Sequence, residues 1–374
     1  MAEPITQTRL RALANVRPER GRVLSVFLNL DPTEFATPPA RSSAITSVMT
    51  AAAHKIDAKE GLSHDERTAL KADVERVREV LAGYDVATNG THAIAVYACG
   101  PLDLLEVVRL RRPVESRVVL DRTAFVEPLV MQGTDEQWMV LLANRRTARI
   151  FVGPGDALRE TDRIVDDVHS QHDQGGWSQL NYQRSVEKEV YDHLVHTAEV
   201  AFDIYKRRGL DRVLLGAPEE LIGEVKGKLH PYLRDRIVGK LAIDIENASL
   251  DEVRAEAGKA IEAHARRYER EALDRLAETV GRGGRGAAGI AQVLDALNQA
   301  RVDTLLINQD FRAGGRVDFE AGLLLPEDAD AGEPVDDIVE PAIEKALEQS
   351  ANPLVVRYHD DLVPLGGIGA VLRF

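Results

Sequence analysis

The chain has 374 residues, of which 44% are hydrophobic and 29% charged, as expected for a soluble protein of two or three domains. Its formal net charge of −14 argues against general non-specific binding to nucleic acid, although a local basic face remains compatible with it. There is neither an apolar run of about 18 residues to predict a membrane span nor an N-terminal pattern typical of a secretory signal. We therefore expect a cytoplasmic protein, in which the single Cys99 lies in an apolar run as a buried, unreactive thiol.

The first part of the chain, residues 1–130, has the pattern of an α/β domain. β-Branched and aromatic runs predict strands, and apolar residues at helical spacing predict helices. The strands are expected at 23–30, 92–99 and 104–110, and the helices at 41–57 and 64–84. Ser63 and Glu66 form a capping box at the start of the second helix. Arginines gather at 9–22 and at 109–117.

The second part, residues 131–265, opens with a predicted hairpin whose turn contains Arg145 and Arg146. We interpret this turn as solvated, with contact to phosphate as the alternative. Further elements are expected in chain order: strands at 138–143 and 148–152, a helix at 180–208, a buried strand of parallel type at 212–216, a helix at 218–229 and a strand at 241–245. The long helix has one apolar face and is ended by Gly209. Cations gather again at 226–240.

The third part, residues 266–374, is entered through a helix expected from Ser249 to about residue 279, which is long enough to connect two domains. A loop rich in glycine and arginine follows at 281–286. The remaining predicted elements are helices at 290–298 and 341–349 and strands at 302–307, 354–358 and the end of the chain. The stretch 327–340 holds seven acids and no base, and we expect it to be a solvated loop.

A polar loop precedes the long helix of the second part and ends in Gly175-Gly176-Trp177-Ser178-Gln179. Adjacent glycines permit backbone shapes that other residues cannot adopt. An exposed tryptophan at such a place either docks onto its own domain or offers a stacking platform for unpaired RNA bases, and the sequence leaves both open. Ser178 and Gln179 are suited to hydrogen bonds with base edges or backbone.

Two histidine pairs flank this loop, His169 with His172 and His193 with His196. The second pair has the spacing of helical metal ligands, but no cysteine joins them, so we expect solvated or RNA-facing histidines and no metal. The glycine-rich run at 281–286 lacks the ending of a phosphate-binding loop. Nothing in the sequence predicts a cofactor or a nucleophile elbow.

The segment 289–307, together with the Gly-Gly loop and the helix after it, resembles the class-I peptide-chain release factors of eukaryotes and archaea and Pelota, in a bacterial branch. The resemblance implies three mixed α/β domains. Residues 1–130 would reach the decoding centre, 131–265 would carry the loop, and 266–374 would face a translation GTPase. It also implies that the second boundary lies inside the long helix, near residue 265.

In release factors, a Gly-Gly-Gln tripeptide brings its glutamine to the ester of peptidyl-tRNA, where hydrogen-bond donors stabilise the oxyanion. Here Trp177 and Ser178 separate Gly176 from Gln179. Pelota, which also lacks the tripeptide, occupies the ribosomal A site without hydrolysis. The chain is most similar to the Balon-type ribosome hibernation factors, including mycobacterial ones, so we expect a stress-response binding protein rather than an enzyme. The alternative is a peptidyl-tRNA hydrolase or rescue release factor using Gln179.

The resemblance implies contacts with ribosomal RNA at the A site, the decoding centre and the peptidyl-transferase centre, and with the elongation factor EF-Tu. No membrane or DNA partner is expected. The residues expected to contact RNA are His172, Gly175, Gly176, Trp177, Ser178, Gln179, Tyr182 and Arg184. The basic clusters at 9–22, 109–117 and 226–240 would face phosphates, and the acidic stretch 327–340 would face solvent or a protein. An RNA-cleaving enzyme using the loop histidines or Arg184 is the least favoured hypothesis.

Overall fold

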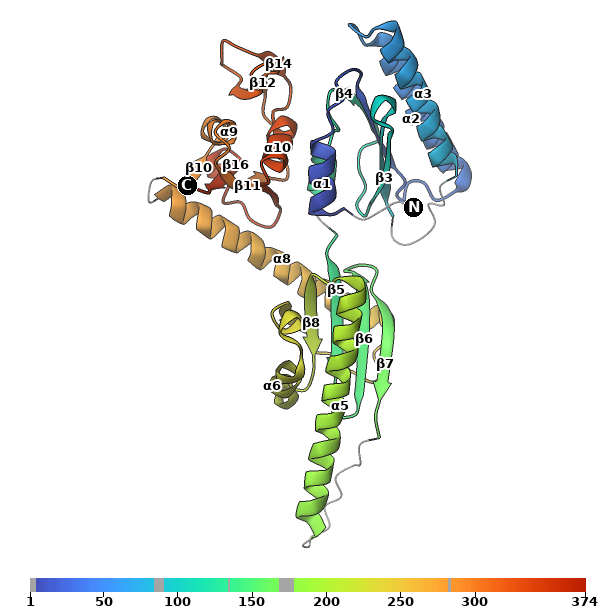
Figure 1. Cartoon of the computed structure of the whole chain (residues 1–374), viewed down its shortest axis with the longest axis vertical. Helices are drawn as coiled ribbons and strands as arrows, with labels where there is room; N and C mark the ends of the chain where they lie inside the picture. The colour runs from blue at the N-terminus through green and yellow to red at the C-terminus, as the bar shows by residue number, and fades with distance from the viewer. Residues whose placement is uncertain (1–4, 84–90, 134, 168–177, 282–283) are drawn as a thin grey trace. The chain divides into compact units, whose positions relative to one another are not determined.

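The computed structural model describes residues 5–83, 91–133, 135–167, 178–281 and 284–374, without the side chains of 178–183. The chain is a mixed α/β protein, as predicted (Figure 1). It divides into two compact units, here called unit 1 (Met1–Asp135 with Glu269–Phe374) and unit 2 (Glu136–Tyr268). The first and third predicted parts thus fall mainly in one unit, while the three-domain division itself stays a prediction.

The N-terminal part of unit 1 is a four-stranded antiparallel sheet in the order β3-β2-β1-β4. Its strands are β1 (Val23–Asn29), β2 (Ala93–Cys99), β3 (Leu104–Leu110) and β4 (Arg117–Asp121). Two helices, α2 (Pro38–Ala58) and α3 (His64–Ala82), cover one face. Side chains alternate between the faces, so Leu24 and Val26 pack under these helices and Phe27 enters the opposite core.

Two local predictions for this part are confirmed. Ser63 and Glu66 form the capping box of α3 through reciprocal side-chain and backbone hydrogen bonds. Cys99 is fully buried in β2, and burial raises the pKa of its thiol. The short 3-10 turn η1 (Gly100–Leu102) follows it.

The C-terminal part of unit 1 contains a sheet in the order β10-β16-β11-β15, in which β11 and β15 are parallel. A smaller antiparallel sheet has the order β13-β12-β14. The strands are β10 (Gly286–Ala288), β11 (Val302–Asn308), β12 (Gly315–Asp318), β13 (Leu323–Pro326), β14 (Glu333–Val335), β15 (Asn352–Val356) and β16 (Ile368–Leu372). The helical elements are α9 (Ile290–Asn298), α10 (Val339–Glu348) and η2 (Val363–Leu365).

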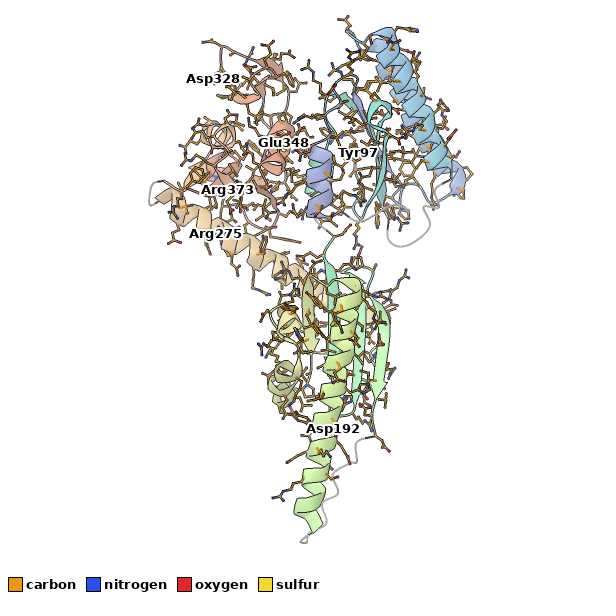
Figure 2. All side chains as sticks on the ribbon, in the orientation of Figure 1. Tyr97, Asp192, Arg275, Asp328, Glu348 and Arg373 are labelled. Atoms are coloured by element: carbon orange, nitrogen blue, oxygen red, sulfur yellow. The ribbon has the colours of Figure 1, made fainter. Side chains whose placement is uncertain are left out.

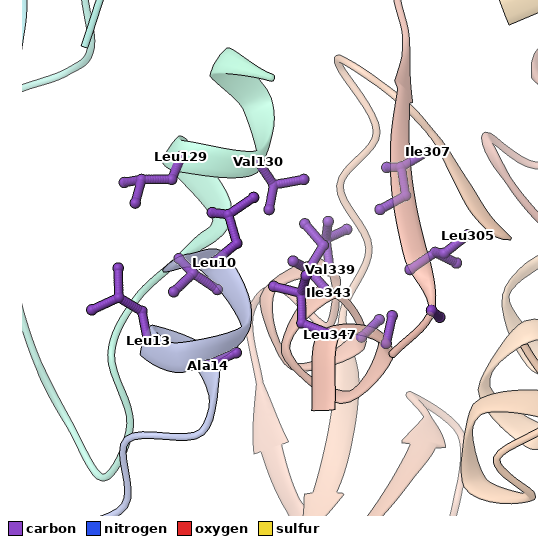
Figure 3. Close-up of a cluster of buried hydrophobic side chains, with 14 of the residues drawn as sticks. Leu10, Leu13, Ala14, Leu129, Val130, Leu305, Ile307, Val339, Ile343 and Leu347 are labelled. Carbon is purple, nitrogen blue, oxygen red and sulfur yellow. The ribbon is translucent and has the colours of Figure 1, made fainter. Parts of the chain in front are cut away.

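The two parts of unit 1 share one hydrophobic core. Helices α1 (Gln7–Ala14) and α4 (Glu127–Gln132) from the N-terminal part contribute Leu10 and Leu129, which lie in the same buried cluster as Ile343 of α10 (Figure 3). At the edge of this core, a carboxylate of α10 caps α4, because Glu340 accepts hydrogen bonds from the backbone N–H groups of Val126 and Glu127, each 2.8 Å long.

Unit 2 is a five-stranded sheet in the order β7-β6-β5-β8-β9 with helices on both faces. Strands β5, β6 and β7 are antiparallel, and β8 runs parallel to both β5 and β9, as predicted for 212–216. The strands are β5 (Gln137–Ala143), β6 (Thr147–Pro154), β7 (Arg159–Val165), β8 (Arg212–Gly216) and β9 (Ile237–Lys240). The helices are α5 (Ser178–Arg208), α6 (Glu219–Lys228), α7 (Pro231–Arg234) and α8 (Leu250–Gly281), which continues into unit 1.

The strand predicted at 241–245 is wrong. The strand lies just before it, and Asp244 accepts hydrogen bonds from the backbone N–H groups of Glu246 and Asn247, which fold this stretch into a turn. The prediction of a solvated loop at 327–340 is wrong in part. This stretch contains β14 and the start of α10, where Glu340 is only partly exposed.

Candidate functional site

The structure describes both ends of the predicted recognition loop. Four of its expected contact residues, His172, Gly175, Gly176 and Trp177, lie outside the described residues. On one side, β7 ends at Val165 and the backbone N–H of Asp166 donates to the carbonyl of Arg146. On the other side, α5 begins at Ser178.

The start of α5 extends beyond the body of unit 2. The first buried residue among those described in this helix is Val186, eight residues after its first residue. At 1.5 Å per residue, about 12 Å of helix precedes its packing against the sheet. Figure 1 shows these first turns reaching past the ends of the strands. The described chain therefore resumes after the loop at Ser178, on the projecting end of α5.

The remaining expected contact residues lie on this projecting end. Ser178, Gln179 and Tyr182 belong to its helical backbone, and their side chains lie outside the described residues. Arg184 is exposed to solvent. The structure thus gathers the last four of the expected residues within the first two turns of one helix, while their contacts with RNA stay a prediction.

The face of α5 that holds it on the sheet is the one predicted from its periodicity. The apolar residues of this face are buried in the core of unit 2, namely Val186, Val190, Leu194, Ala201 and Ile204. Charged residues such as Asp192 lie on the exposed side (Figure 2). A helix anchored over so many turns is a rigid support for whatever its first turns carry.

The histidine pair on α5 contacts Asp166, the residue that follows strand β7. Nδ1 of His193 lies 2.6 Å from the Asp166 carboxylate, and Nδ1 of His196 lies 3.4 Å from the same oxygen. Burial opposes ionisation of Asp166, but the hydrogen bonds with His193 and His196 outweigh it and lower the pKa of this carboxyl group. The loop therefore leaves the sheet from a residue that is bonded to the middle of α5.

This contact gives both His193 and His196 a partner in Asp166. Within the described parts of the chain, no three His, Cys, Asp or Glu side chains come together as metal ligands. Sequence reasoning identified the i, i+3 pair but missed Asp166. In the sequence, Asp166 is marked only as an acidic residue directly after 159–165, a stretch that was not predicted to be a strand.

Many arginines of the basic cluster at 9–22 are engaged inside unit 1. Arg17 pairs with Glu344 at 2.9 Å and with Glu348, and Arg9 pairs with Glu106. These ion pairs join segments of unit 1, so their first effect is structural. In the described residues, no helix has both the length and the apolar character required to cross a membrane.

Residues 125–264 match the model of a family described as bacterial archaeo-eukaryotic release factor family 10. The matched segment holds all five strands of unit 2, the loop and about the first half of α8. The match therefore covers the candidate site and the scaffold that carries it.

The curated proteins similar to this chain include archaeal release-factor subunits. The chain is 25% identical over 199 residues to peptide chain release factor subunit 1 of Archaeoglobus fulgidus, covering 51% of this chain and 49% of that protein. The chain spans about half the length of the curated relatives it matches.

Among solved structures, one similar chain is archaeal Pelota in a model of ribosome-bound Pelota and ABCE1, at 13% identity, with 100% of this chain and 95% of that chain covered and a TM-score of 0.42. Another is Dom34 of S. cerevisiae, described as a translation termination-like factor involved in RNA quality control pathways and interacting with Hbs1. It has 10% identity, coverage of 75% of this chain and 80% of that chain, and a TM-score of 0.41. Residues 125–264 thus match a family of bacterial archaeo-eukaryotic release factors, and over about half of the chain the curated relatives are archaeal release-factor subunits.

Proposed function

We propose that this chain is a translation factor that binds the ribosomal A site and holds the ribosome idle, without releasing the peptide. The observation that carries the proposal is the match of residues 125–264 to a release-factor family. Within that segment, the Gly-Gly-Trp-Ser-Gln sequence leads into α5, whose first described turns project beyond the strands of unit 2. This is where a protein of this superfamily would present a loop to the peptidyl-transferase centre.

The position of Gln179 supports the proposed lack of release activity. Ester hydrolysis needs a water molecule and oxyanion donors held within a fraction of an ångström of the reactive geometry. Gln179 is three residues beyond Gly176, and its backbone belongs to the first turn of α5. The indole of Trp177 also adds bulk next to the glycines. The loop is therefore suited to fill the site rather than to orient a water molecule.

The finer assignment is a hibernation factor of the Balon type that acts under stress. Its partners would be ribosomal RNA at the decoding and peptidyl-transferase centres and, through residues 266–374, EF-Tu. Arg184 supports the RNA contacts, because it is an exposed cation close to the tip of α5. The same A site would be occupied by aminoacyl-tRNA in a translating ribosome, so binding and elongation should exclude each other.

Co-sedimentation of the native chain with ribosomes from stationary-phase cells, with and without EF-Tu, tests this proposal. We expect binding that competes with aminoacyl-tRNA. Trp177→Ala should weaken it roughly tenfold, the loss of about one stacked base. Asp192→Ala, an exposed change on the same helix away from the tip, should have no effect. Failure to co-sediment under both conditions would refute the proposal.

The second candidate, a peptidyl-tRNA hydrolase that uses Gln179, is favoured by the names of the release-factor relatives. A release assay on ribosomes carrying labelled peptidyl-tRNA separates the two functions. Release by the native chain that Gln179→Ala abolishes would replace the idle-state proposal. We expect no release above the rate without factor, together with unchanged ribosome binding by Gln179→Ala.

A further inference from the structure

A cluster of aromatic rings lies on the side of unit 2 where α6 and α7 meet α5. The rings of Phe202 and His230 are stacked, with centroids 3.9 Å apart and planes at 13°. Tyr205 lies parallel to Phe202 at 5.9 Å, and Tyr232 meets His230 edge-on at 4.9 Å. Stacked rings at a surface leave their outer faces and edges for a ligand.

Two rings of this cluster, and the nearby ring of Tyr191, each have a cation beside them. Nζ of Lys228 lies 3.6 Å from the ring centroid of Tyr191, and Nζ of Lys206 lies 5.1 Å from that of Phe202. The guanidinium of Arg236 lies 5.1 Å from the ring of Tyr205. We call the group of Tyr191, Phe202, Tyr205, Lys228, His230 and Tyr232 the aromatic–cationic surface.

Two rings of this surface are open to solvent. Tyr191 is 51% exposed and Tyr232 is 56% exposed, although tyrosine usually buries more of its ring. Phe202 and Tyr205 are half-buried and contact the core of unit 2. The inner rings thus belong to the fold, and the outer rings are not needed by it.

The surface runs along α5 toward the candidate loop. Tyr191 and Phe202 are eleven residues apart, which is close to three helical turns, so both lie on one side of α5 about 16 Å apart. Arg184 precedes Tyr191 by seven residues, close to two turns, and lies on the same side. Arg184, Tyr191 and Phe202 therefore lie along one side of α5, from its projecting end to the aromatic–cationic surface.

The local charge is opposite to that of the whole chain. The stretches 202–208 and 226–236 contain seven lysines and arginines against only Asp203 and Asp235, in a chain of net charge −14. Asp203 is itself paired with Lys206 at 2.7 Å. A positive region on an acidic protein selects a polyanionic ligand.

Hydrogen bonds order this surface before any ligand arrives. The backbone N–H of Tyr232 donates to Nδ1 of His230, which places the proton of a neutral ring on Nε2. Arg236 donates to the backbone carbonyls of Leu210 and Tyr232, at 3.0 and 2.8 Å. Ordered rings and cations lose little conformational entropy on binding.

We propose that the aromatic–cationic surface binds single-stranded or looped RNA. Tyr232 and Tyr191 would stack on unpaired bases, and Lys228, Lys206 and Arg236 would contact the phosphates beside them. Alternating rings and cations match a chain of alternating bases and phosphates, whereas an acidic protein segment would use the charges and leave the exposed rings without a planar partner. The inference deepens the proposed function, since ribosomal RNA is the ligand it implies, but RNA binding is measurable without the ribosome.

The test is the fluorescence anisotropy of a labelled single-stranded RNA of mixed sequence, about twelve nucleotides long, titrated with the full chain at two salt concentrations. We expect Tyr232→Ala to weaken binding about tenfold and Tyr232→Phe to retain the native affinity, because stacking needs the ring and not the hydroxyl group. Lys228→Glu should weaken binding and reduce its salt dependence.

Matched controls lie in the same unit. Tyr268→Ala changes another exposed tyrosine, 42% exposed, and Lys259→Glu changes an exposed lysine of α8. Both should retain the native RNA affinity. Trp177→Ala separates the contribution of the loop, and unchanged thermal melting shows that each variant folds.

RNA affinity that Tyr232→Ala and Lys228→Glu leave within twofold of the native value would overturn the inference, as would preferential binding of a polyglutamate peptide. Ribosome co-sedimentation distinguishes this failure from failure of the proposed function. If the native chain and Tyr232→Ala bind ribosomes equally well, the proposed function stands and the RNA-binding role of this surface is rejected. A chain with Tyr232-dependent RNA binding that does not co-sediment retains the surface and loses the function.

Discussion

Replacing Ile343 with alanine tests whether the two distant segments of unit 1 share one core. Ile343 is fully buried in α10 and lies in the same cluster as Leu10 and Leu129 (Figure 3). Truncating a buried isoleucine removes its transfer free energy and leaves a cavity, at about 2–5 kcal/mol in well-packed sites. Because three elements from two parts of the chain border the site and cannot all collapse into it, we expect a loss of about 3 kcal/mol in the free energy of unfolding.

The single thiol of the chain reports this loss from the other segment. Cys99 lies in β2, is fully buried and belongs to the same cluster as Ile343. Burial raises the pKa of the thiol, so the native form holds little thiolate and labelling requires opening of the structure. A loss of about 3 kcal/mol increases the open population roughly 100-fold. We expect the rate of labelling by a disulfide reagent under native conditions to rise by about that factor.

Leu194→Ala is the matched control, since it makes a similar cavity in the core of unit 2. It should destabilise unit 2 and leave the labelling rate of Cys99 unchanged. The reasoning fails if Ile343→Ala lowers the stability measured by circular dichroism while Cys99 labels at the native rate. That result would mean that the N-terminal part opens independently of α10.

Three further predictions concern single side chains. Glu340→Ala should lower the free energy of unfolding by about 2–4 kcal/mol, measured in urea, because two buried N–H groups of α4 lose their acceptor; Glu340→Gln should recover part of it. Hydrogen bonds from Thr33 lower the pKa of Asp31 to about 2, from 3.8. The stability that this carboxylate contributes is therefore present above about pH 4 and lost as the pH falls toward 2, and Asp31→Asn should flatten the acid-unfolding curve in that window. Arg149→Met should destabilise unit 2 by about 3 kcal/mol, since Arg149 is buried and forms two bonds of 2.9 and 2.7 Å to Glu160. Tryptophan fluorescence, which arises only in unit 2, would report a stability loss under 1 kcal/mol if this reasoning is incorrect.

The elements that were predicted well from the sequence have either a regular spacing of apolar residues or a residue that marks the end of the element. The buried face of α5 follows from apolar residues at helical spacing, and its end follows from Gly209, which has φ of +61°. Strand β7 was missed because its residues are mostly charged and exposed, as on an edge strand that avoids pairing with other chains. The strand predicted at 241–245 failed because alternating apolar residues also occur in a turn that packs on a core.

For the candidate site, the composition of the sequence predicted the loop but not the contacts that hold its first residues against α5. The bond between Asp166 and His193 joins residues 27 positions apart, and no local pattern encodes it. The same holds for the stack of Phe202 on His230, which depends on how α6 returns the chain to α5. Contacts of this kind are set by tertiary packing, which periodicity does not report.

Unit 2 is an insertion between the two segments of unit 1, and this fixes the order in which the protein is completed during its synthesis. Helix α10 is made about 200 residues after α4. At roughly 5–20 residues per second, the interval is about 10–40 s. Throughout it, α2 and α3 cover one face of the nascent N-terminal sheet, and the core on the other face, with Phe27 and Tyr97, lacks the side chains that α10 supplies. The helices that cover both faces of the unit 2 sheet are synthesised well before α10. The first segment of the chain to be translated therefore completes its core only when the last segment has been made.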